Sequence, residues 1–155
     1  MIIDRELMFS NAQAVVADVA STDLIDLAPL GLAASAGGTP VNLGRNIGVG
    51  EDLYIWVSLD VASAGGSTSV NLQTDADVAF GSPTTLVTGL FVIPISTPAG
   101  TKYFTKMPMG TDIFYERYIR LFYDITTATL TVSAGIVKDA DAWVSYVGGY
   151  TNAAG

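Results

Sequence analysis

The chain has 155 residues, a length typical of one domain with a single hydrophobic core. It carries 7 Lys and Arg residues against 15 Asp and Glu residues, a net charge of −8, so we expect neither nucleic acid nor an anionic membrane as a partner. The chain has no histidine and no cysteine, which excludes His-based triads, His-ligated zinc or iron, and disulfide bonds.

The first residues predict an arm rather than part of the domain. They do not form a signal peptide, because charges at positions 4–6 interrupt the apolar residues, and no stretch is long and apolar enough to span a membrane. Residues 10–20 tolerate a helix, but we interpret them as irregular or extended. We therefore expect an arm over residues 1–20 and a single domain over residues 21–155. No turn residue folds the apolar side chains of the arm back, so these should contact a neighbouring subunit: Ile2, Ile3, Leu7, Met8 and Phe9.

Strand patterns dominate the rest of the chain. A short strand is expected at residues 24–27, and residues 53–60 and 69–74 alternate as the two strands of a hairpin. The turn of this hairpin would use Gly65 and Gly66, which supply positive φ angles. The longest expected loop covers residues 33–46.

The second half of the chain continues the strand pattern. Residues 91–95 form a strand in which Pro94 predicts an edge or a bulge, since proline cannot donate to a ladder. Residues 102–106 are a short strand, and residues 115–125 and 129–137 suggest a second hairpin. A last strand is expected at residues 143–147. About eight strands separated by turns predict an all-β fold, an antiparallel sandwich of the jelly-roll kind.

The strand sequence ERYIRLFYDI at residues 116–125 presents two unlike faces. Ile119, Leu121 and Tyr123, together with Ile125, form the better candidate for a core face. The opposite face interleaves aromatic rings with charges, and interfaces are enriched in such residues. We therefore predict that its side chains are covered by a neighbouring subunit or by another segment of this chain: Tyr118, Arg120 and Phe122.

Motifs for catalysis or metal binding are weak. The Asp-Ala-Asp triplets at residues 75–77 and 139–141 could share a calcium ion, but turn capping explains them more simply. Paired carboxylates for glycoside hydrolysis could come only from Glu51 with Asp52 or from Glu116 with Asp124, and nothing groups them into a site. We expect no enzymatic activity, cofactor or metal.

Several segments resemble a known family. They are MIID with FSNAQAV near the start, STDLIDL, GEDLYIWV, ERYIRLFYDI and TLTVSAGIV. In this order they resemble the jelly-roll capsid cement, or head decoration, proteins of tailed bacteriophages, of the type first described for a Bordetella podovirus.

The resemblance implies a non-enzymatic protein made in the host cytoplasm. It would sit on the outer surface of the virion head as a homo-oligomer and clamp neighbouring copies of the major capsid protein. A dimer and a trimer both suit this role, and we favour the dimer. The family's contact residues have no compact motif that can be transferred to this chain position by position.

Two other kinds of protein fit the sequence. One is a carbohydrate-binding sandwich, in which an exposed Trp56 or Trp143 would stack on sugar rings. The other is a structural module of a phage tail or fibre.

Overall fold

The computed structural model describes residues 5–27, 31–33, 41–43, 52–109 and 113–138. Apart from one short 3-10 helix, η1 (Arg5–Leu7), its regular elements are all strands. The strands are β1 (Met8–Val15), β2 (Val19–Ala20), β3 (Ile25–Asp26), β4 (Gly31–Ala33), β5 (Val41–Leu43), β6 (Tyr54–Ala64), β7 (Ser67–Asp75), β8 (Thr84–Ile93), β9 (Lys102–Lys106), β10 (Tyr118–Thr126) and β11 (Thr129–Val137).

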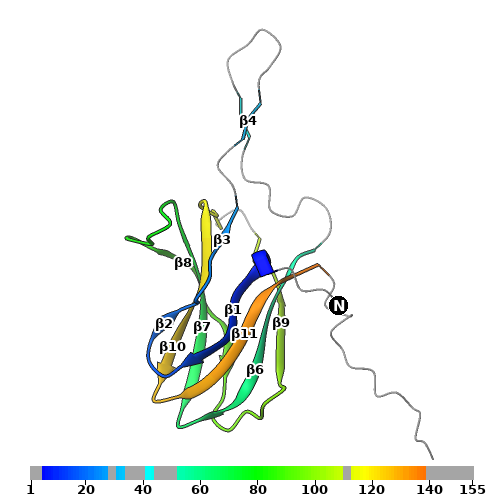
Figure 1. Cartoon of the computed structure of the whole chain (residues 1–155). Coiled ribbons are helices and arrows are strands. Elements are labelled where there is room, and N and C mark those ends of the chain that lie inside the picture. The colour runs from blue at the N-terminus through cyan, green and yellow to red at the C-terminus, as the bar shows by residue number, and fades with distance from the viewer. Residues whose placement is uncertain (1–4, 28–30, 34–40, 44–51, 110–112, 139–155) are drawn as a thin grey trace, which may run out of the picture.

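Two antiparallel sheets pack face to face as a sandwich (Figure 1). One sheet has the order β1-β11-β6-β9 and the other has the order β2-β10-β7-β8, with β3 also paired to β10. Among the described residues, β4 and β5 form a separate two-stranded sheet. Because β2 and β3 share one position beside β10, the two orders are those of an eight-stranded jelly roll. The predicted fold class is confirmed.

Both predicted hairpins are wrong, although their strands exist. β6 pairs with β11 and β9, whereas β7 pairs with β10 and β8, so the connection between β6 and β7 crosses from one sheet to the other. The connection between β10 and β11 crosses in the same way, and the two connections lie against each other. A Cβ atom on Gly66 would lie 1.6 Å from the carbonyl oxygen of Thr126. Glycine is needed here for close approach of two backbones, while Gly65 does adopt a positive φ of 87°.

The core is made by the inward faces of the two sheets. On β10, Ile119, Leu121 and Tyr123 are fully buried, which confirms the predicted core face of this strand. They pack with buried apolar residues from the other strands, among them Phe9, Val15, Ile55, Val57, Leu59, Val70, Leu72, Ile93, Leu130 and Val132.

The predicted arm over residues 1–20 is wrong from residue 8 onwards. β1 pairs with β11 from Met8 to Val15, and the side chain of Phe9 is 0% exposed inside the core. The sequence pattern did not predict this strand, because two register shifts break the alternation of inward and outward side chains along it. The shifts lie between Met8 and Ser10 and between Ser10 and Gln13. The domain therefore includes β1 and is not limited to residues 21–155.

Most of the remaining strand predictions are close to the observed elements, but the strand expected at residues 91–95 is only partly right, because β8 begins at Thr84 and ends at Ile93. β3 lies within the expected segment 24–27, and β9 and β11 have the expected bounds. Pro94 follows the last residue of β8, which is an edge strand. The strand expected at residues 143–147 and much of the loop expected at residues 33–46 lie outside the described residues.

Candidate functional site

The outer face of β10, which the sequence marked as a contact surface, is partly covered by this chain itself. Arg120 is half-buried, and its guanidinium carbon lies 4.1 Å from the centre of the Phe80 ring. Its Nε donates a hydrogen bond to Oε1 of Gln73 on the neighbouring strand β7, at 2.9 Å. Arg120 is therefore covered by another segment of the same chain, which is one of the two outcomes expected for it.

The segment that carries Phe80 is held by a turn built on Asp75. The carboxylate of Asp75 accepts hydrogen bonds from the backbone N–H of Asp77 at 2.9 Å and of Ser82 at 3.1 Å. These bonds, the one from Asp77 above all, lower the pKa of Asp75 below its ordinary value. The capping explanation is confirmed for the Asp-Ala-Asp triplet at residues 75–77, and the triplet at 139–141 lies outside the described residues.

Tyr118 and Phe122 are half-buried on the same outer face. The guanidinium carbon of Arg117 lies 4.8 Å from the centre of the Tyr118 ring. Phe122 is flanked in the sheet by Ala20 of β2 and Asn71 of β7. Contact of these two rings with a neighbouring subunit stays a prediction.

The predicted contact residues of the N-terminus do not form one surface. Phe9 is buried in the core between the sheets, and Met8, which pairs with Gly135 of β11, is buried outside that core. Their assignment to an interface is wrong, because the folded chain already covers both side chains. Leu7 is 39% exposed and can reach a partner. Ile2 and Ile3 lie outside the described residues.

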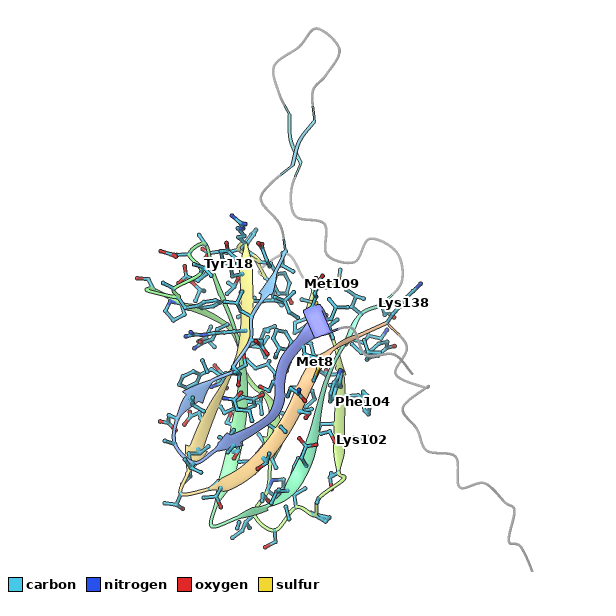
Figure 2. The ribbon with its side chains drawn as sticks, viewed as in Figure 1. Met8, Lys102, Phe104, Met109, Tyr118 and Lys138 are labelled. Carbon is cyan, nitrogen blue, oxygen red and sulfur yellow. The ribbon has the colours of Figure 1, made fainter. Side chains whose placement is uncertain are left out.

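One end of the sandwich carries exposed apolar side chains that the sequence did not reveal. We call it the Phe114 end, where β9 ends and β10 begins, and its exposed residues are Leu7, Met109 and Phe114. The Phe114 side chain is 75% exposed. Met109 and Tyr118 lie at this same end (Figure 2). Phe114 belongs to a connection between strands, where no alternation exists to distinguish an exposed ring from a buried one.

Further exposed apolar side chains lie on and beside β8. Val92 lies near the end of this strand and Ile95 follows it, whereas Val78 precedes the strand and lies toward its other end; all three are exposed. Single exposed apolar residues are ordinary on a protein surface.

Trp56 cannot serve as a sugar-stacking platform. It lies on the outer face of its sheet, directly opposite Gly135 of β11, yet it is only 2% exposed. A Cβ atom on Gly135 would lie 3.1 Å from Nε1 of Trp56 and 2.7 Å from the carbonyl oxygen of Leu7. The absent side chain at Gly135 thus makes room for the indole. The other proposed platform, Trp143, lies outside the described residues.

Within the described ranges, no three His, Cys, Asp or Glu side chains are grouped closely enough to hold a metal ion. Over the same ranges, no helix has the length and apolar character needed to cross a membrane.

Comparison with known protein families identifies the family of this chain. No curated protein matches the chain. The model of the Bbp16 family matches residues 9–139, which covers most of the chain and runs from the start of β1 to just beyond β11. The chain belongs to the Bbp16 family.

Proposed function

We propose that this protein is a capsid cement protein of a tailed bacteriophage, which binds the outer surface of the head and stabilises contacts between major capsid protein subunits. The similarity to cement proteins in five segments of the sequence supports this role. Membership of the Bbp16 family and the jelly-roll fold are compatible with it. In this proposal the protein acts as a homo-oligomer and performs no catalysis.

The observation that carries the proposal is the exposed apolar surface of the Phe114 end. A protein that remains a free monomer in solution rarely exposes several large apolar side chains at one end, as this protein exposes Phe114, Met109 and Leu7. Full burial of one such side chain against a partner contributes about 2 kcal/mol. Because a closed shell repeats each contact many times, modest contacts of this kind add up to a large stabilisation of the shell.

The charge of the protein fits the same role. With a net charge of −8, it would be attracted to basic patches on an outer capsid surface and would not compete for the packaged nucleic acid. The half-buried ring of Tyr118, the first residue of β10, lies at the Phe114 end and would extend the contact; the half-buried ring of Phe122 lies farther along the same face of β10.

Two exposed apolar residues allow a matched test of the contact surface. Phe114→Ser should lower the occupancy of the protein on phage heads, because it removes a ring that is 75% exposed. Val16→Ser changes a residue that is 69% exposed at the opposite end of the sandwich, beyond β1, and should leave the occupancy unchanged. Equal loss for both variants, or no loss for Phe114→Ser, would count against this surface.

The location in the virion separates the cement role from that of a tail or fibre module. Antibody labelling of intact virions viewed by electron microscopy should mark the head surface. Labelling confined to the tail would replace the proposal with the tail or fibre alternative, and absence of the protein from purified virions would contradict both.

A further inference from the structure

Two arginines lie close together in the sequence, one just before β10 and one on it, but only one has an acidic partner. Arg117 binds Asp26 through two hydrogen bonds, from Nε to Oδ1 at 3.0 Å and from Nη2 to Oδ2 at 2.8 Å. Arg120, on the outer face of β10, donates from Nε to Oε1 of Gln73 at 2.9 Å. Among the described residues, no hydrogen bond or salt bridge reaches Nη1 or Nη2 of Arg120.

Asp75 attracts Arg120 but does not pair with it. The carboxylate of Asp75 accepts hydrogen bonds from the backbone N–H groups of Asp77 and Ser82, as described above. Burial disfavours the charged form of Arg120 and lowers its pKa, and the attraction of Asp75 offsets this effect only in part. The described part of the chain therefore leaves the positive charge of Arg120 incompletely compensated.

The guanidinium of Arg120 is nevertheless held in one position. Gln73, itself buried, fixes Nε, and the ring of Phe80 covers the guanidinium at 4.1 Å from its central carbon. Phe80 is buried and has a φ of 49°, a backbone conformation that bulky residues rarely adopt. Such strain persists where the surrounding structure fixes it, and it is frequent at binding sites. The guanidinium is thus ordered before any partner binds.

A planar guanidinium held in this way matches a carboxylate, because its two terminal amino groups can donate to two carboxylate oxygens. The half-buried rings of Tyr118 and Phe122 lie two residues before and two residues after Arg120 on the same face of β10. Arginine and aromatic side chains grouped in this way are common where interfaces concentrate their binding energy. Tyr118 lies at the Phe114 end (Figure 2), so this face continues the contact surface of the proposed function.

We propose that Arg120 binds the carboxylate of an Asp or Glu side chain of the major capsid protein, with Nη1 and Nη2 as the donors. This inference rests on the proposed function and extends its contact from the Phe114 end along the outer face of β10. A chain with a net charge of −8 repels acidic groups over most of its surface, so a capsid carboxylate is accepted at Arg120 and disfavoured elsewhere. The pairing would fix the orientation of the protein on the head.

Two substitutions that preserve the net charge test this contact. Arg120→Lys keeps the positive charge but loses the planar pair of donors, so it should weaken binding to phage heads that lack the protein by at least about tenfold. Arg117→Lys makes the same exchange three residues away. It should leave binding within about twofold of the wild type, because Arg117 already pairs with Asp26 and a surface salt bridge contributes little. Equal binding by the two variants would overturn the proposal.

Gln73→Glu separates binding from folding. The new carboxylate would lie where Oε1 of Gln73 already accepts from Nε of Arg120, so it would neutralise the guanidinium from within the chain. Thermal unfolding should show no loss of stability, while binding to the heads should fall by at least about tenfold. If Arg120 served only the fold, this variant would bind as well as the wild type, and the proposal would be wrong.

Cross-linking identifies the partner and does not depend on the affinity of the variants. Arg120→Lys places a primary amine on the outer face of β10, and a carbodiimide joins an amine to a carboxylate in contact with it. Mass spectrometry of saturated heads should find this amine linked to an Asp or Glu of the major capsid protein. In Arg117→Lys the new amine should link to Asp26 of the same chain. Links from position 120 only to a second copy of this chain, or none at all, would overturn the proposal.

The binding data distinguish failure of this inference from failure of the proposed function. If the wild type does not bind the heads, the cement role is wrong and this inference falls with it. If the wild type binds, and Arg120→Lys and Gln73→Glu bind as well as Arg117→Lys, this inference is wrong and the cement role stands.

Discussion

The hydroxyl groups of Ser10 and Tyr123 lie 2.8 Å apart in the interior and connect β1 of one sheet to β10 of the other. Ser10 donates its only hydroxyl proton to Oε1 of Gln13, at 2.7 Å, so Tyr123 is the donor to Ser10. Gln13 in turn accepts from the N–H of Thr22 and donates Nε2–H to the carbonyl oxygen of Ala20, each at 2.8 Å. This chain of hydrogen bonds fixes edge strand β1 to the segment that leads into the second sheet.

Removal of the Tyr123 hydroxyl and removal of the Ser10 hydroxyl should lower the free energy of unfolding by different amounts. Tyr123→Phe leaves Ser10 still bonded to Gln13 and should lower the free energy of unfolding by about 1 kcal/mol. Ser10→Ala leaves the buried Tyr123 hydroxyl without an acceptor, so it should cost more, about 2 kcal/mol. Guanidinium denaturation of both variants measures the difference, and a larger loss for Tyr123→Phe would contradict the assigned direction of the bond.

Two tyrosines should make the protein sensitive to alkali. Burial raises the pKa of Tyr115 to about 12, and burial also raises the pKa of Tyr123. Since the unfolded pKa is about 10, the folded state holds these protons more tightly, and their contribution to stability is full below pH 10 and declines above it. The decline should approach about 1.4 kcal/mol per pH unit for Tyr123. The slope between pH 10 and 12 should be shallower in Tyr123→Phe, and an unchanged slope would refute this origin.

Gly135 should not tolerate a side chain. In Gly135→Ala the new methyl group would meet the carbonyl oxygen of Leu7 and the indole of Trp56, and the resulting overpacking should lower the free energy of unfolding by about 2 kcal/mol. Gly81→Ala is the matched control, since nothing lies within 4 Å of the new Cβ position, and it should be neutral within about 0.5 kcal/mol. Thermal unfolding compares the two, and equal melting temperatures would contradict the packing described for Trp56.

The burial of Phe9 predicts which truncation the fold survives. Phe9→Ala should cost about 3 kcal/mol, because it empties a fully buried site, whereas Leu7→Ala should cost well under 1 kcal/mol. Deletion of residues 1–9 should therefore destabilise the domain, while deletion of residues 1–4 preserves every described contact. Circular dichroism and denaturation measure both truncations. A deletion of residues 1–9 with wild-type stability would restore the idea of a separate arm.

The sequence predicts the faces of strands better than their partners. The alternation of Ile119, Leu121 and Tyr123 on β10 identified the core face, because a period of two follows directly from strand geometry. Pairing could not be read in the same way. Gly65 and Gly66 suggest a hairpin turn, but here they permit two inter-sheet connections to touch, and both arrangements need the same glycines.

The contact surfaces were harder to predict for a related reason. Leu7, Met8 and Phe9 are consecutive apolar residues, yet Leu7 is exposed and Phe9 is buried. The sequence does not reveal this difference, because β1 begins at Met8 and its register shifts break the alternation of side chains between the two faces. The ring of Phe80 covers Arg120, although the two residues are forty positions apart in the sequence. Such a contact depends on the turn at Asp75 and leaves no local signal on β10.

Co-sedimentation with phage heads that lack this protein tests the central claim most directly. The purified wild type should bind such heads saturably, in a fixed ratio to the major capsid protein, and should raise the temperature at which the heads break open. If the protein remains in the supernatant at concentrations of tens of micromolar and the heads open at an unchanged temperature, the proposed role as a capsid cement protein is wrong.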